Sequence, residues 1–231
     1  MNWSWLPEYA PQLLNGFVVT LLIFSVSVVV GFVLAVPLAL AQIGGGWLTR
    51  KLAHGFCITL RGIPLLLLLF LFYYGLGSVL ALSRGLREVA PWLVRLDAFW
   101  YVLIAFTINF AAHEAEVLRG ALRAVPRGEL EAAESFGLGR FTILRRIWLP
   151  SAVLRVYPVL ASDVIAQLKA TPVAFVVPVV DLMAVAQNVL QDRLLIYEPL
   201  LFVAAIYLTA TFLVLKFSAL IGRLVPQNWL E

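Results

Sequence analysis

A stripe of polar side chains crosses an otherwise apolar segment between about residues 98 and 118. Asn109, His113 and Glu116 stand at i, i+4 and i+7, so a helix would carry all three on one face. A charge at the centre of a bilayer costs at least about 2.5 kcal/mol, which disfavours a lipid-facing position. We therefore expect this stripe to face a helix-bundle interior or an aqueous pathway.

Asp163 and Lys169 lie in a second apolar segment, from about residue 151 to residue 180, which several prolines interrupt. Proline removes a helical hydrogen bond, and freed backbone groups at broken helices often build transport sites. Six residues separate the two charges, which places them about 120° apart on a regular helix, so each needs its own partner.

Two of these charges admit a simpler structural role. Glu116 lies near the end of its segment and could pair with Arg119 or Arg123. Lys169 could extend its long side chain to the headgroup region, depending on where its helix breaks. The polar pathway is therefore favoured more for Asn109 and His113 than for Glu116.

Motifs for catalysis or metal binding are absent from the sequence. It contains no G-x-x-x-x-G-K-[ST] loop, so any ATP would be bound by a separate chain. His54 and His113 lie in different segments, and no His and Cys cluster has metal-ligand spacing. The glycines at 44–46 lack the preceding strand of a nucleotide loop and are expected to end a helix. We expect no catalytic residue and no metal site.

The composition indicates an integral membrane protein. Apolar residues make up 62% of the 231 residues and charged residues 13%, which is too apolar for a soluble core of this size. The single Cys57 cannot form an internal disulfide. The net charge of +4 is explained below by membrane topology, so no nucleic-acid partner is expected.

Apolar intervals predict an all-α membrane domain, residues 1–231, with about five transmembrane helices. A helix needs about 20 residues to cross roughly 30 Å of hydrocarbon. The first span is long enough to bend near Pro37, and the fourth is expected to be broken. The predicted spans are 13–43, 62–83, 98–118, 151–180 and 199–217.

Lysines and arginines predict the orientation, because cytoplasmic segments carry an excess of them. Four fall in the predicted outer segments: Arg84, Arg87, Arg95 and Arg193. Twelve fall on the inner side: Arg50, Lys51, Arg61, Arg119, Arg123, Arg127, Arg140, Arg145, Arg146, Arg155, Lys216 and Arg223. The N-terminus is therefore expected outside and the C-terminus in the cytosol.

A long polar segment, residues 126–149, then faces the cytosol. It predicts one helix from about Arg127 to Phe136, ended by Gly137, and a second from about Arg140 to Trp148 that stops at Pro150. An amphipathic connector lying on headgroups is one interpretation. A helical knob that inserts into a partner's groove is the other.

This segment resembles the EAA loop of binding-protein-dependent ABC importer permeases. It contains Glu131, Ala132 and Ala133, then Gly137 after three residues, and I-W-L-P at 147–150 after nine more. The resemblance implies that Glu131, Ala132, Ala133 and Gly137 belong to coupling helices that dock on an ATPase subunit. We refer to residues 126–149 as the coupling loop.

Three flanking blocks resemble the polar amino acid subfamily. A-H-E-A-E-V-L-R-G at 112–120 is similar to A-Y-x-A-E-I-x-R-G, and L-R-G-I-P-L at 60–65 to L-R-G-T-P-L. L-K-A-T-P-V at 168–173, which includes Thr171, is similar to L-K-D-T-S-L, and the residues after it look closest to the histidine, lysine, arginine and opine branch. The sequence departs from the subfamily pattern at His113, Ala170 and Pro172. These differences bear on which substrate is carried and not on membership of the family.

The resemblance implies a type I ABC importer permease in a bacterial inner membrane, without enzymatic activity of its own. Its partners would be ATPase subunits that carry ATP and magnesium, a second permease subunit, an extracytoplasmic substrate-binding protein and membrane lipid. The resemblance also implies an amino acid or opine as substrate, and the branch resemblance together with the carboxylates of Glu116 and Asp163 favours one with a cationic side chain. The substrate pathway would comprise Asn109, His113, Glu116, Asp163, Lys169 and Thr171. A subunit of an ion-coupled secondary transporter and a membrane scaffold are the alternatives.

Overall fold

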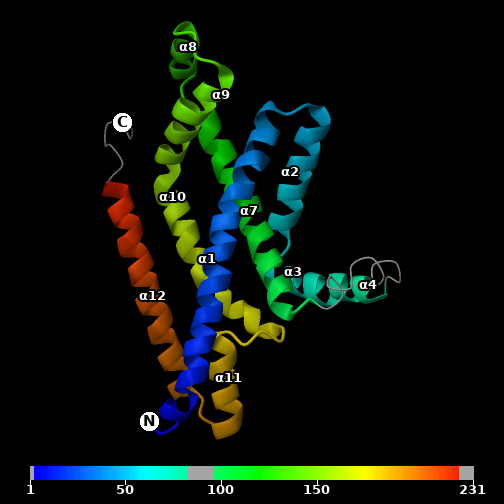
Figure 1. Cartoon of the computed structure of the whole chain (residues 1–231), viewed down its shortest axis with the longest axis vertical. Helices are drawn as coiled ribbons and strands as arrows, with labels where there is room; N and C mark the ends of the chain where they lie inside the picture. Colours follow the sequence, from blue (N-terminus) through cyan, green and yellow to red (C-terminus); the bar gives the residue numbers. More distant parts are fainter. Residues whose placement is uncertain (1–2, 83–95, 224–231) are drawn as a thin grey trace.

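The computed structural model describes residues 3–82 and 96–223, and within these ranges the chain is helical with no strand (Figure 1). Four helices in the described ranges are long and apolar enough to cross a membrane, or five if one bent pair counts as a span. The predicted all-α membrane fold with about five spans is confirmed. Arg84, Arg87 and Arg95, which entered the orientation argument, lie outside the described residues.

Helices α1 (Leu6–Gly44) and α7 (Ala98–Ala124) pack along each other at the centre of the bundle. Small residues permit this approach: a side chain at Gly31 would place its Cβ 2.6 Å from a ring carbon of Phe110. Helix α1 begins earlier than predicted, because Pro7 suits a first helical turn. It also continues through Pro37, where a bend was expected.

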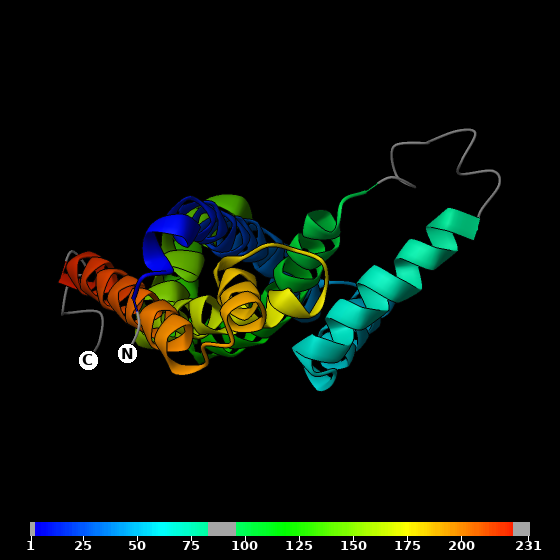
Figure 2. The ribbon, with the colours of Figure 1, turned by 90° about the horizontal axis from the view of Figure 1, so that it is seen from below.

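The second predicted span, 62–83, does not form one straight helix. Helix α2 (Trp47–Gly62) is followed by α3 (Leu65–Phe70), the π-helical turn η1 (Leu71–Leu76) and α4 (Gly77–Leu82). The two arms are bent by 106° at the break, and the second arm projects away from the bundle (Figure 2). The residue before a proline avoids helical dihedrals, and Ile63 before Pro64 is extended, with φ −94° and ψ 125°.

The coupling loop forms a helical hairpin at one end of the molecule (Figure 1). Helix α8 (Arg127–Ser135) ends at Gly137, whose φ of +74° confirms the predicted glycine cap. The next helix was expected to stop at Pro150, and this is wrong. Helix α9 (Arg140–Ile143), the π-helical turn η2 (Leu144–Trp148) and α10 (Leu149–Ala170) form one continuous helix, because proline is tolerated in the first turn after the π-bulge.

The regular α-helix of the fourth span ends at its C-terminal end near Ala170, not at Pro158. Helix α10 runs through that proline to Ala170, where the 3₁₀ segment η3 (Thr171–Val176) begins with Pro172 in its first turn. Within the predicted fourth span, the regular α-helix therefore gives way to 3₁₀ geometry at Thr171. Helix α12 (Tyr197–Arg223) then returns along the bundle as the last span.

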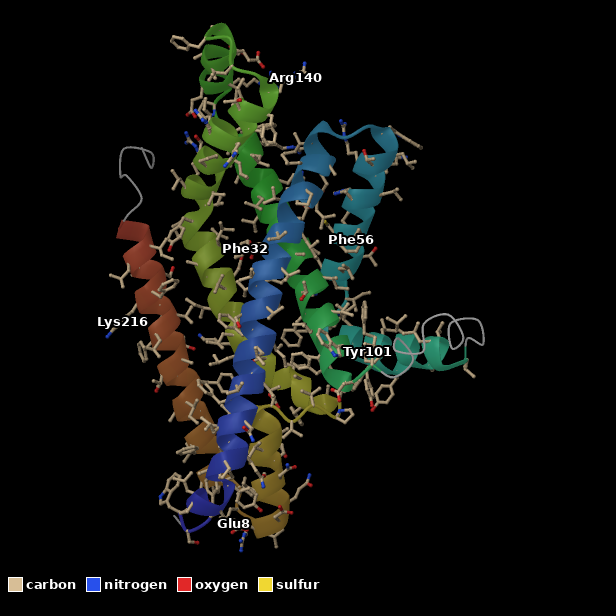
Figure 3. All side chains as sticks on the ribbon, viewed as in Figure 1. Glu8, Phe32, Phe56, Tyr101, Arg140 and Lys216 are labelled. Carbon is tan, nitrogen blue, oxygen red and sulfur yellow. The ribbon has the colours of Figure 1, made fainter. Side chains whose placement is uncertain are left out.

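A helix that the sequence did not predict, α11 (Leu182–Arg193), packs against the N-terminal half of α1. Asp181 is fully buried and caps α11 by accepting a hydrogen bond from the Ala184 N–H at 2.8 Å. At the far end of α11, the Tyr9 hydroxyl donates to Asp192 at 2.8 Å and Arg193 pairs with Glu8. Glu8 therefore marks the end of the bundle opposite Arg140 of the coupling loop (Figure 3).

Candidate functional site

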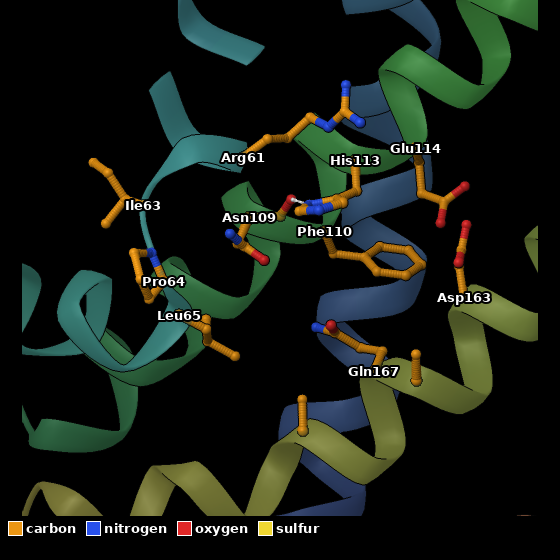
Figure 4. Close-up of a pocket in the computed structure, with 12 residues that line it drawn as sticks. Arg61, Ile63, Pro64, Leu65, Asn109, Phe110, His113, Glu114, Asp163 and Gln167 are labelled. Carbon is orange, nitrogen blue, oxygen red and sulfur yellow. Dashed lines mark hydrogen bonds between the residues drawn. The ribbon is translucent and has the colours of Figure 1, made fainter. Parts of the chain in front are cut away.

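A cavity of about 350 Å³ lies where the end of α2, the middle of α7 and the C-terminal half of α10 meet (Figure 4). Three of the predicted pathway residues line it: Asn109, His113 and Asp163. Three further polar residues line it that the sequence analysis did not assign to a pathway: Arg61, Glu114 and Gln167. We call this space the central cavity.

Asn109 and His113 form one wall of the central cavity beside the bend after α2. The Asn109 side-chain amide donates to the Leu60 carbonyl at 3.1 Å, which satisfies one of the carbonyls left free at the end of a helix. The His113 ring nitrogen Nδ1 lies 3.1 Å from the Asn109 carbonyl, within hydrogen-bond distance. This wall therefore ties α7 to the bend, and the His113 ring remains exposed.

Gln167 fixes the opposite side of the central cavity. It is buried, and its amide nitrogen lies 3.1 Å from the Ser27 hydroxyl of α1 and 3.4 Å from the Phe106 carbonyl of α7. Buried polar groups that find partners define a unique packing. Gln167 thus holds α10 against both central helices, so the cavity wall is rigid at this point.

Glu114 and Asp163 face each other across α7 and α10 (Figure 4). Glu114 is 0% exposed, and neither of its carboxylate oxygens has a hydrogen-bond partner among the described residues. Asp163 is partly exposed and stands nearer the open space. Glu114 does not belong to the predicted stripe, because the cavity spans two neighbouring ridges of α7, with residues 109 and 113 on one and 110 and 114 on the other.

Glu116, the third member of the predicted stripe, does not line the central cavity. Its carboxylate lies 2.6 Å from the Arg119 guanidinium, 3.7 Å from Arg61 and 3.9 Å from the His54 ring. The partners come from α2 and α7, so Glu116 joins these helices. Of the two ion pairs that the sequence suggested for Glu116, with Arg119 or with Arg123, the structure contains the one with Arg119.

Lys169 and Thr171 also lie outside the central cavity. Lys169 is exposed in the last turn of α10. Thr171 is fully buried, its hydroxyl donates to the Leu168 carbonyl at 2.8 Å, and it lies 3.1 Å from the Tyr207 hydroxyl. Thr171 therefore joins the start of η3 to α12.

A second candidate site is the coupling loop. Ala133 is buried inside the hairpin, whereas Glu131, Ala132 and Gly137 are exposed. Two phenylalanines of the hairpin are strongly exposed, Phe136 at 85% and Phe141 at 74%. Exposed large apolar groups that project from a helical knob are typical of a surface that a partner covers.

Two contacts connect the coupling loop to the helices around the central cavity. The Trp148 indole nitrogen donates to the Leu122 carbonyl of α7 at 2.8 Å. Arg155 of α10 pairs with Glu129 of α8 at 2.9 Å. The coupling loop is therefore joined directly to α7 and α10, the two helices that carry most of the polar cavity residues.

Residues 27–226 match the family described as binding-protein-dependent transport system inner membrane component. The chain belongs to this family. It is therefore the permease component of an ABC importer rather than an enzyme, and it works with a separate ATPase and a second permease subunit.

Relatives of the permease cover nearly its whole length. The octopine transport system permease OccM of Rhizobium meliloti is 33% identical over 90% of this chain and 84% of its own. The nopaline permease NocM of Agrobacterium fabrum is 32% identical over 90% of this chain and 85% of its own. The histidine/lysine/arginine/ornithine permease HisM of Salmonella typhimurium is 30% identical over 94% of this chain and 89% of its own.

Solved structures agree with this assignment. A crystal structure of an amino acid ABC transporter with histidines matches the permease with a TM-score of 0.78 at 26% identity, covering 96% of this chain and 98% of that one. An inward-facing MetNI methionine ABC transporter has a TM-score of 0.76 at 18% identity, covering 95% of this chain and 98% of that one. This likeness shows that the fold is shared.

Proposed function

We propose that the permease carries a basic amino acid or an opine across the inner membrane through the central cavity. The observation that carries this proposal is a cavity at the junction of three membrane helices with two carboxylates on one side and only one permanent cation, Arg61, among its described lining residues. Relatives named for octopine, nopaline and histidine, lysine, arginine and ornithine support it. Asn109, His113 and Asp163 would contact the substrate on its way, whereas Glu116 and Thr171 would hold the helices in place.

The complete importer would contain a second permease subunit, ATPase subunits that bind ATP and magnesium, and an extracytoplasmic substrate-binding protein. The N-terminus would lie outside and the coupling loop and C-terminus in the cytosol. The cluster of arginines around the loop supports this orientation, including Arg127, Arg140, Arg145 and Arg146.

The coupling loop would transmit the closure of the ATPases to the cavity. Glu131, Ala132, Ala133 and Gly137 would form or support the docked surface, with Phe136 and Phe141 as exposed apolar contacts. Through Trp148 and Glu129 the docked loop would move α7 and α10. Such a movement would open the cavity alternately to each side of the membrane.

Transport in reconstituted vesicles tests this function. The complete importer is inserted into vesicles with ATP trapped inside, and the substrate-binding protein and labelled arginine are added outside. We expect uptake that requires the internal ATP and that lysine, histidine or octopine reduces. Competition by glutamate or leucine, with none by basic compounds, would contradict the substrate. Uptake that ATP added outside drives, with none inside, would contradict the orientation.

A further inference from the structure

An apolar groove of about 480 Å³ lies between α1, α10 and the C-terminal half of α12, on the side of the molecule away from the central cavity. Its wall on α1 consists of Val28, Phe32 and Val36, which follow one face of that helix at a spacing of four residues. Leu118 of α7 also lines the groove and is only 2% exposed, so the groove reaches between the outer helices to the centre of the bundle. We call this space the lateral groove.

The lateral groove offers little to a polar ligand. None of the described residues that line it carries a charge, and its side-chain hydroxyl groups belong to Tyr157 of α10 and Ser218 of α12. The Tyr157 hydroxyl donates to the Ser218 carbonyl and lies 3.1 Å from the Ser218 hydroxyl. Because these polar groups already bind each other across the two helices, a hydrocarbon occupant fits the groove.

The surroundings and the size of the lateral groove favour an alkyl chain over a protein helix. Its lining includes Phe217, which is 64% exposed on the last membrane span, so the groove opens toward the bilayer. Along α10 the groove extends from Val153 to Val164, and a helix about 10 Å across would fill roughly 1,300 Å³ over that length. This is more than twice the volume of the groove. A single acyl chain is much thinner than a helix and is present wherever the groove faces lipid.

The place of the lateral groove in the bundle leads to the same occupant. Helices α12 and α2 lie on opposite sides of α1 in two perpendicular views (Figure 1, Figure 2). A second permease subunit that shares the transport path would pack on the side of α2 and the central cavity. The side of α12 is then left to the lipid of the bilayer.

Two arginines lie beyond the coupling-loop end of the lateral groove. Arg145 and Arg146 precede Val153 by about two turns on the continuous helix that leads into α10, and both are exposed. Neither forms an ion pair with another described residue, since the pairs there involve other arginines. Cationic side chains at the end of a membrane span attract anionic headgroups. A lipid whose chain lies in the groove would therefore have its phosphate near positive charge.

We propose that the lateral groove binds one acyl chain of an anionic phospholipid of the inner leaflet, with the phosphate attracted to Arg145 and Arg146. The leaflet follows from the orientation proposed above, whereas the site is independent of which substrate is carried. Helices in a membrane are held together by close packing rather than by exclusion of water. The bound chain supplies packing that α1, α10 and α12 do not supply to one another along the groove, so it joins α12 to the bundle.

Photolabelling of the complete importer in vesicles tests this site. The vesicles contain a trace of phosphatidylglycerol or phosphatidylcholine with a diazirine on one acyl chain, and the labelled positions of the permease are quantified. We expect labelling on the groove face of α10 and α12 that exceeds labelling of the exposed residues Val29, Val30 and Val33 of α1 and that unlabelled phosphatidylglycerol displaces. Phosphatidylglycerol should label the groove at least about fivefold more than phosphatidylcholine, which is the effect of one arginine near a membrane surface.

Variants then locate the site. Val164→Phe fills part of the lateral groove and should remove most of the displaceable labelling. Val159→Phe is the matched control: the same change at a position of α10 that is 48% exposed and does not line the groove should leave the labelling unchanged. Replacing both Arg145 and Arg146 with glutamine should lower the preference for phosphatidylglycerol while the groove is still labelled. Because only importer that elutes as the intact complex is analysed, a loss of folded protein does not imitate these effects.

Four results would overturn the proposal. Groove labelling that unlabelled phosphatidylglycerol does not displace, or that equals the labelling of the exposed face of α1, would show ordinary bilayer lipid. Labelling below that of the exposed face would show that a protein segment, such as one from the second permease subunit, covers the groove. Equal losses in Val164→Phe and Val159→Phe would place the lipid elsewhere on α10. Equal labelling by the two lipids, unchanged by the glutamine variant, would refute the role of the two arginines.

Discussion

Replacing Gly137 with valine should weaken the docking of the ATPase and lower ATP-driven transport without preventing membrane insertion. Gly137 has a φ of +74°, and its N–H donates to the Glu134 carbonyl at 2.9 Å to end α8. A left-handed conformation costs an L-residue about 1–2 kcal/mol, and a Cβ at this position would meet no atom within 4 Å, so the expected cost is one of backbone strain. A change of this size alters a conformational equilibrium about 5- to 30-fold.

The assay is ATP-driven arginine uptake in vesicles, with the co-purified ATPase as a second measurement. Gly137→Val should lower both at normal permease levels. Gly137→Asn should retain most activity, because asparagine tolerates the left-handed region while adding a side chain of similar size. Gly139→Thr is the control, since Gly139 has a φ of −69° and threonine, which has the shape of valine, suits the start of α9. Normal uptake by Gly137→Val, or equal losses in the valine and asparagine variants, would refute the argument from strain.

Two further predictions concern the contact between α11 and α1. Gly16→Leu should destabilise the permease by about 1–3 kcal/mol, because a Cβ there would lie 2.8 Å from the Asp181 carbonyl oxygen, a backbone atom that cannot turn away. Thermal unfolding in detergent should show this loss, while Gly55→Ala, with no atom within 4 Å of its Cβ, should be neutral or slightly stabilising; equal midpoints for both variants would contradict the prediction. Burial raises the pKa of Asp181 to about 6, so its contribution to stability is full below about pH 4 and is lost as the pH rises through about 6. Asp181→Asn keeps an oxygen for the Ala184 N–H and should raise the unfolding midpoint more at pH 8 than at pH 4.5, and parallel pH profiles for the two proteins would show that Asp181 is not the titrating group.

Local patterns predicted much of the architecture. Apolar intervals long enough for a bilayer located α1, α7, α10 and α12, because span length is a property of a single segment. The glycine cap at Gly137 was likewise predictable, since a helix end followed by a left-handed residue depends on a few neighbouring positions. The cavity residues Asn109, His113 and Asp163 were found because polar groups in apolar segments need a protected environment.

Other features depended on how helices cover one another. Periodicity places Glu116 on the same face as Asn109, but α2 packs over that face one turn further along and supplies Arg61 and His54. Glu114 reaches the central cavity because α10 brings Asp163 opposite it (Figure 4).

The sequence by itself determined the membrane class, the approximate spans, the helical hairpin of the coupling loop and the family resemblance. The tertiary structure alone decided the 106° bend after Gly62, the continuous helix through Pro150, the packing of α11 on α1 and the position of Glu114 opposite Asp163. The physical reason is that hydrophobic length and turn chemistry act within one segment, whereas a bend angle or a cavity wall is set by contacts between segments far apart in the chain. The partner of a buried charge is therefore fixed only when the helices have packed.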